Sequence, residues 1–255
     1  MSDVAPQGGV HGNPPDASFY EGQDLEALAN LPNYWRWILD HFREELKGTV
    51  IEIGAGLGNF TALYADSVEQ LRLLEPAKNL YQHLESRFAS KSHVVTRCGL
   101  LEELHAEEAA SPGSHGAPYD AALLVSVLEH IENDVQMLRQ LFDLLRPRGA
   151  LLLFVPALPF LYGAMDTRVG HFRRYTREGL ADVIRRAGFG IELLKFFDVL
   201  GVFPWLIAGR VLRQSKHHEG AAQIYDRFAV PIGKMIESRV APPLGKNLIA
   251  IARRP

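Results

Sequence analysis

Short apolar runs alternate with stretches of helical periodicity along most of the chain. Runs rich in Val, Ile and Leu, typical of strands, occupy residues 49–53, 71–75, 93–97, 119–126, 150–155, 189–197 and 246–252. Between them, apolar positions spaced three and four apart predict helices over residues 24–46, 59–66, 77–89, 133–145 and 177–187. Residues 105–118 read as a loop. Strands that alternate with helices predict an α/β fold built on a mostly parallel sheet.

Two segments depart from this alternation. Residues 1–22 are rich in proline and glycine, which predicts a flexible N-terminal arm ahead of a single domain over residues 23–255. Residues 198–245 separate the last two predicted strands and carry two apolar helical patterns, the second interrupted by Pro231. We expect this helical insertion to form a lid or packing element, with peripheral membrane contact and a homodimer contact as the alternatives.

Composition narrows the class of protein. A chain of 255 residues with 47% hydrophobic residues can build one α/β domain with a sizeable core. The net charge of -3 gives no general attraction to nucleic acid, which is not expected as a partner. The single cysteine, Cys98, excludes an intrachain disulfide, and the pair His217–His218 reads as exposed loop, so no metal site is expected. We see no signal peptide or membrane-spanning run and expect a cytoplasmic protein.

A glycine-rich turn follows the first predicted strand. Gly54, Gly56 and Gly58 stand at alternate positions, two residues after Glu52. Glycines let the backbone bend sharply and approach a ligand closely. The predicted helix after the turn presents unpaired backbone N–H groups at its N-terminus. Both features favour a nucleotide-like cofactor. The dinucleotide fingerprint needs its third glycine one residue later, where this chain has Asn59, so a nicotinamide cofactor is disfavoured.

Three segments together resemble a known family. The pattern E-x-G-x-G-x-G over residues 52–58 resembles the first motif of class I S-adenosylmethionine-dependent methyltransferases. The run L-E-H-I at residues 128–131 and the stretch L-Y-G-A-M-D-T-R-V-G-H-F-R-R-Y at residues 161–175 resemble one subset of that family. The resemblance, from about Tyr34 to Ile251, implies a Rossmann-like, seven-stranded, mostly parallel sheet with helices on both faces and a helical insertion before the last strand.

The resemblance also implies S-adenosylmethionine as cofactor and S-adenosylhomocysteine as product. In that family the glycine turn lies under the methionine part of the cofactor, and the acid corresponding to Glu52 helps to hold its amino end. Glu75, about twenty residues after the first glycine, is expected to bind the ribose hydroxyls. The full set of expected cofactor residues is Tyr34, Glu52, Gly54, Gly56, Gly58, Asn59, Glu75, Pro76, Gly99, Leu100, Ser126, Val127 and His130.

Two of these cofactor assignments have structural alternatives. Tyr34 lies on a predicted helix whose apolar side is expected to pack on the sheet. His130 follows Glu129 and invites assignment as an acid–base pair, whereas a histidine that shapes the pocket by hydrogen bonding is favoured. Many relatives carry an acid after the third strand, which is lacking at Cys98–Leu100, so adenine is expected to contact backbone groups there.

Residues 156–175 follow the carboxyl end of a strand and are expected to form the roof of the pocket. The predicted catalytic residues are His171, Tyr162 and Asp166, because histidine titrates near neutral pH and suits proton removal from an acceptor. Arginine can grip a phosphate or carboxylate, and the predicted substrate-binding residues are Tyr162, Arg173, Arg174 and Tyr175. The alternative is a buried polar network that locks this loop onto the domain.

The resulting hypothesis is transfer of a methyl group from S-adenosylmethionine to an O, N or C atom of a small-molecule acceptor, such as a natural product, a sugar or a lipid-linked intermediate. The methyl already sits on a sulfonium, so alignment and desolvation are expected to supply most of the catalysis. Two alternatives stay open: a family member that catalyses cyclisation or another non-transfer reaction, and a non-catalytic binding protein.

Overall fold

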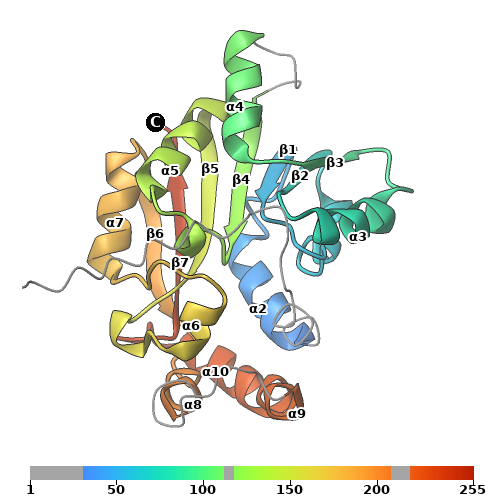
Figure 1. Ribbon diagram of the computed structural model, residues 1–255. Helices are drawn as coiled ribbons and strands as arrows, with labels where there is room; N and C mark the ends of the chain where they lie inside the picture. Colours follow the sequence, from blue (N-terminus) through green and yellow to red (C-terminus); the bar gives the residue numbers. More distant parts are fainter. Residues whose placement is uncertain (1–30, 112–117, 208–218) are drawn as a thin grey trace, which may run out of the picture.

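The structure is a computed structural model that describes residues 31–111, 118–207 and 219–255. The predicted N-terminal arm and the pair His217–His218 lie outside these residues. A single seven-stranded sheet runs through the domain in the order β3-β2-β1-β4-β5-β7-β6 (Figure 1). Its strands are β1 Thr49–Ile53, β2 Gln70–Glu75, β3 Val94–Cys98, β4 Tyr119–Val125, β5 Leu145–Pro156, β6 Gly190–Phe197 and β7 Asn247–Arg253.

The pairing of the strands confirms the predicted fold class. Strands β1 to β5 pair in parallel, and β7 is antiparallel to both of its neighbours, β5 and β6. The glycine turn follows β1 and the L-E-H-I segment follows β4, and these two strands are paired with each other. Their carboxyl ends therefore lie at the same edge of the sheet, which is where open α/β sheets bind ligands.

Helices cover both faces of the sheet, as predicted (Figure 1). Alternate strand residues face two separate cores, so that Leu151 and Leu153 of β5 lie on one side and Leu152 on the other. The first core packs against α4 Leu101–Ala110, α5 Asp134–Leu144 and α7 Arg177–Arg186, and the second against α2 Pro32–Phe42 and α3 Lys78–Phe88. This burial on both sides explains why the central strands are apolar at successive positions.

Two local predictions are wrong. The helix expected over residues 59–66 is a pair of short 3-10 turns, Thr61–Leu63 and Ala65–Ser67. The buried carboxylate of Glu52 accepts hydrogen bonds from the hydroxyls of Thr61 and Tyr64, which holds this short segment on the end of β1. The loop expected over residues 105–118 is helical as far as Ala110, because α4 is anchored by two buried leucines at its start.

The predicted insertion is helical and packs on the domain. It contains α8 Val202–Trp205, α9 Glu219–Ile224, a π-helical turn Tyr225–Ala229 and α10 Val230–Glu237. The carboxylate of Asp226 caps α2 by accepting hydrogen bonds from the backbone N–H groups of Asn33 (3.2 Å) and Tyr34 (2.8 Å). Lys234 forms an ion pair with Asp40 of α2. No helix in the described parts of the chain has the length and apolar character needed to cross a membrane.

Candidate active site

The glycine turn is built from left-handed backbone. Gly54, Gly56 and Gly58 have φ angles of 67°, 57° and 72°, a region that side chains disfavour. The N–H of Gly54 donates to the carbonyl of Leu74 at 2.8 Å, which folds the turn over the end of β2. A Cβ atom on Gly54 would lie 2.7 Å from Cγ2 of Val127, so the turn also lies directly against the segment after β4. The fold thus brings together Val127 and the three glycines of the turn, all of which are predicted cofactor residues.

Glu75 ties the glycine turn to the end of β2. Its Oε2 accepts a hydrogen bond from the N–H of Gly56 at 2.8 Å, and its Oε1 accepts one from the N–H of Ala77 at 2.9 Å. The side chain is buried, and burial raises its pKa although both backbone hydrogen bonds oppose that effect. Each carboxylate oxygen keeps capacity for a further donor such as a ribose hydroxyl.

Glu52 is the second buried carboxylate beside the turn. Its Oε2 accepts hydrogen bonds from Thr61 Oγ1 (2.7 Å) and Tyr64 Oη (2.6 Å). Burial raises the pKa of Glu52 to about 7, and the nearby charge of Glu75 acts in the same direction. Among residues 31–111, 118–207 and 219–255, no lysine or arginine forms an ion pair with either acid. A cationic ligand would therefore stabilise both carboxylates in their ionised form.

The other predicted cofactor residues divide into two groups. Tyr34 is buried in an aromatic cluster, and its hydroxyl accepts a hydrogen bond from Asn247 at 2.7 Å, which favours the packing alternative for this residue. Asn59 accepts a hydrogen bond from Arg87 of α3 at 2.7 Å. The remaining ones follow the carboxyl ends of β2, β3 and β4, namely Pro76, Gly99, Leu100, Ser126 and His130.

Asp166 is the centre of the hydrogen-bond network in residues 156–175, which we call the roof segment. This fully buried carboxylate, in the short helix α6 Ala164–Arg168, accepts hydrogen bonds from His171 Nδ1 (2.8 Å), Arg174 Nε (2.8 Å) and the N–H of Gly163 (3.0 Å). Burial alone would raise the pKa of Asp166, but the hydrogen bond from His171 and the charge of Arg174 outweigh it and lower that pKa. Because Asp166 fixes Nδ1, the second ring nitrogen of His171 is left to face the site.

The four predicted substrate-binding residues are engaged inside the protein. Arg174 is buried against Asp166 and lies over the ring of Trp205 at 4.7 Å. Arg173 pairs with Asp134 at 2.9 Å, and Tyr175 donates to the same carboxylate at 2.9 Å; the hydroxyl of Tyr162 donates to the carbonyl of His171 at 2.7 Å. These contacts favour the locking network over direct substrate contact, because the polar atoms already have buried protein partners.

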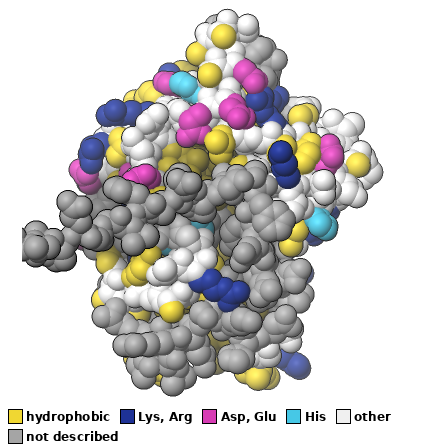
Figure 2. All heavy atoms as spheres, viewed as in Figure 1, with side chains coloured by type: hydrophobic (Ala, Val, Ile, Leu, Met, Phe, Trp, Pro, Cys, Tyr) yellow, Lys and Arg dark blue, Asp and Glu magenta, His cyan; other side chains and the backbone are white. Residues whose placement is uncertain are grey.

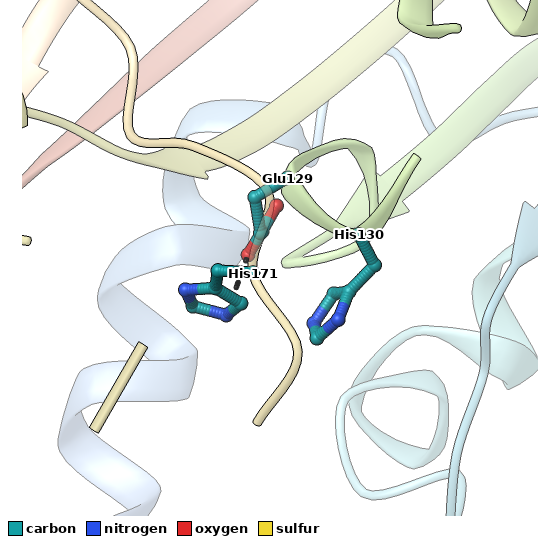
Figure 3. A group of neighbouring side chains, drawn as sticks. All are labelled: Glu129, His130 and His171. Atoms are coloured by element: carbon teal, nitrogen blue, oxygen red, sulfur yellow. Dashed lines mark ion pairs between the residues drawn. The ribbon is translucent and has the colours of Figure 1, made fainter. Parts of the chain in front are cut away.

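His171, Glu129 and His130 converge after the carboxyl end of β4 (Figure 3). Glu129 and His130 belong to the 3-10 turn Leu128–His130 after β4, and the N–H of Phe172 donates to the carbonyl of Glu129 at 2.8 Å, which holds the roof segment against that turn. Burial raises the pKa of Glu129 to about 8. Burial, aided by the neighbouring His171, lowers the pKa of His130 to about 4.

Sequence reasoning missed several members of this site. The sequence disfavours Glu129 as one half of an acid–base pair, and it shows Asp134 only as part of an amphipathic helix. Thr61 and Tyr64, which hold Glu52, carry no local signal because their partner lies on a strand nine or more residues earlier. Each of these contacts joins segments that only the folded chain brings together.

Comparison with known proteins agrees with this fold. Residues 25–194 match the model of a methyltransferase domain family, and the chain belongs to that family. A probable S-adenosylmethionine-dependent methyltransferase of Mycolicibacterium smegmatis is 27% identical over 193 residues, which is 75% of this chain. The chain spans 63% of that relative's length. The family match confirms the expected methyltransferase family, and the description of the relative agrees with the expected cofactor, S-adenosylmethionine.

Solved structures share the fold at low sequence identity. A putative methyltransferase in complex with the Haloferax volcanii Trm112 methyltransferase activator superposes with a TM-score of 0.63 at 12% identity, covering 92% of this chain and 95% of that one. The [4+2]-cyclase SpnF superposes with a TM-score of 0.54 at 16% identity, covering 94% and 85%. At these identities the likeness concerns the fold alone, and the fold is found with more than one chemistry.

Proposed function

We propose that this protein transfers the methyl group of S-adenosylmethionine to an oxygen or nitrogen atom of a small-molecule acceptor. The observation that carries the proposal is the pair of buried carboxylates, Glu52 and Glu75, on either side of the glycine turn. Both side chains lack a protein cation among the described residues, and both pKa values are raised by burial. The cofactor supplies a cationic amino group for one carboxylate and ribose hydroxyls for the other.

The acceptor end of the reaction is assigned to the roof segment. Asp166 holds Nδ1 of His171, so Nε2 of that imidazole is free to take the proton of an acceptor O–H or N–H group. The acceptor lone pair then attacks the methyl carbon as the sulfur–carbon bond breaks, and neutral S-adenosylhomocysteine leaves. Tyr162 acts as a positioning residue, because its hydroxyl holds the backbone carbonyl of His171. A carbon acceptor would additionally need stabilisation of a carbanion.

A small molecule is favoured over nucleic acid as the acceptor. The chain is acidic overall, with a net charge of -3. On the face seen in Figure 2, the coloured Lys and Arg side chains lie scattered among acidic and apolar ones rather than in one continuous stripe. A nucleic-acid-binding surface usually needs such a stripe. Natural products, sugars and lipid-linked intermediates are the acceptor classes to be tested first.

The test uses the full chain with three ligands in calorimetry: S-adenosylmethionine, S-adenosylhomocysteine and NAD. We expect micromolar binding of the first two and none of NAD. Incubation with methyl-labelled S-adenosylmethionine and extracts of the native host should then label a low-molecular-weight product. Tighter binding of NAD would contradict the cofactor assignment, and cofactor binding without transfer of label to any acceptor would favour a non-transfer reaction.

A further inference from the structure

Three potential metal-ligand side chains meet at the acceptor end of the site (Figure 3). One donor atom from each of Glu129, His130 and His171 lies within 4.8 Å of the other two. Metal–donor distances of about 2.0–2.2 Å place the ligands of a tetrahedral ion about 3.3–3.6 Å apart, so a modest side-chain rotation would bring them into coordination. The cluster joins residues from two segments, the turn after β4 and the roof, that are distant in the sequence.

The carboxylate of Glu129 lacks the partners that its burial requires. Its exposed fraction is 0%, and neither oxygen accepts a hydrogen bond from another described residue. Nε2 of His171 lies 3.8 Å from Oε1, which is beyond hydrogen-bonding distance. Buried polar groups are nearly always satisfied, since an unpaired carboxylate in a dry environment is costly. A bound group that contacts both oxygens would supply these partners.

Both imidazoles are arranged as in metal sites. Metal-bound histidine usually donates its other ring nitrogen to a carboxylate or a carbonyl, which fixes the ring and leaves a lone pair for the metal. His171 has this arrangement, because Nδ1 is bound by the buried Asp166 and Nε2 points toward Glu129. His130 has a hydrogen bond with the backbone of Gly170, and its ring meets that of His171 edge to face at 4.6 Å.

We propose that Glu129, His130 and His171 bind one divalent transition-metal ion such as Zn²⁺. Two imidazoles and one carboxylate form a ligand set that suits such ions and leaves coordination positions open. The sequence predicts no metal here, because the ligands follow no recognisable spacing. The chemical consequence of this inference rests on the proposed function. An acceptor hydroxyl bound at an open coordination position has a lowered pKa and releases its proton to water. His171, as a metal ligand, then does not accept that proton. The oxygen lone pair then forms the bond to the methyl carbon as the sulfur–carbon bond breaks.

The test measures metal binding directly on the full chain. Chelator-treated protein is titrated with Zn²⁺ in calorimetry and with Co²⁺ by visible absorption. We expect one ion per chain and d–d bands of a four- or five-coordinate Co²⁺ site. Glu129→Gln and His130→Ala should each weaken binding at least about 100-fold, beyond the 10–100-fold cost of outer-shell changes. An unchanged circular dichroism spectrum of each variant verifies that the fold is intact.

Matched controls separate this site from other histidines. His105 also faces a carboxylate, that of Asp143 at 3.0 Å, but lies on the surface of α4 away from the cluster. His105→Ala and a variant without the pair His217–His218 should bind the ion as tightly as the parent protein. Equal binding by Glu129→Gln, or no binding at micromolar ion, would overturn the proposed metal site. If the chain binds no ion and still transfers the methyl group after chelation, the proposed metal site is overturned and the proposed function still stands.

Discussion

The ionisation of Glu52 offers a direct test of the cofactor site. Its pKa in the folded protein is raised by burial from 4.5 to about 7. The folded state therefore binds more protons than the unfolded state at pH values between these limits. The free energy of unfolding falls with rising pH wherever the folded state holds more protons than the unfolded state. Ionisation of Glu52 therefore lowers the free energy of unfolding as pH rises from about 4.5, and this loss of stability is complete above about 7. Glu52→Gln keeps the shape of the side chain and removes this ionisation.

The magnitude follows from the two pKa values. Each unit of pKa difference corresponds to about 1.36 kcal/mol, so a rise from 4.5 to about 7 amounts to roughly 3 kcal/mol of lost stability at high pH. Most of this loss, about 2–3 kcal/mol, falls between pH 5 and pH 8. The amide oxygen of glutamine can still accept the hydrogen bonds from Thr61 and Tyr64, so the variant should retain the local structure.

The assay is urea unfolding of the parent protein and of Glu52→Gln at pH 5 and pH 8. The free energy of unfolding of the parent should fall between these pH values by about 2–3 kcal/mol more than that of the variant. Buried carboxylates that do not interact with Glu52 contribute equally to both proteins and cancel in the difference, and the influence of Glu75 on the pKa of Glu52 is weaker than that of burial. Parallel changes in the two proteins would refute the reasoning, because they would mean that Glu52 has the same pKa folded and unfolded.

The same carboxylate should respond to the cofactor. A cationic amino group beside Glu52 stabilises its ionised form, so binding of S-adenosylmethionine near pH 6.5 should release a proton. Calorimetry in two buffers of different ionisation enthalpy measures this proton directly. The Glu52→Gln variant should release none, and an equal release by both proteins would assign the proton to another group.

Three further changes test the turn, the ribose acid and the insertion. Glu75→Ala should weaken S-adenosylmethionine binding about tenfold in calorimetry by removing a charge-assisted hydrogen-bond acceptor; unchanged affinity would argue against the ribose role. Gly54→Ala places a methyl group against Val127 on left-handed backbone and should cost about 1–3 kcal/mol in urea unfolding, whereas an unaltered midpoint would show that the turn can relax. Asp226→Ala uncaps α2 and should cost about 1–2 kcal/mol, against less than about 0.5 kcal/mol for the exposed control Asp182→Ala.

The roof segment also shows how a polar network can determine the position of a single side chain. Asp166 and Arg174 are buried, and Asp134 receives both Arg173 and Tyr175. These contacts hold the loop against the strand ends, and they leave His171 as the polar group of the loop that faces Glu129. Residues that the sequence suggests for substrate binding thus serve to hold the residue that we place at the acceptor.

The sequence by itself determined the fold class, six strands within a residue or two of their observed bounds, and the glycine turn with its acids at the ends of β1 and β2. These features depend on short-range rules: alternation of apolar residues, the φ angles open to glycine, and the tendency of parallel strands to present their carboxyl ends at one edge. Local sequence did not predict the structure of a short segment that is held by a residue outside it, as residues 59–66 are held by the carboxylate of Glu52 on β1.

Only the tertiary structure decided which polar groups meet. It placed Asp226 of the insertion at the start of α2, bound the two arginines of the roof to buried acids, and brought Glu129, His130 and His171 together. No pattern along the chain encodes these contacts, because they join segments whose separation in sequence is unrelated to their distance in space. The burial that raises the pKa of Glu52 has the same origin, since a charged group is desolvated only when the whole domain closes around it.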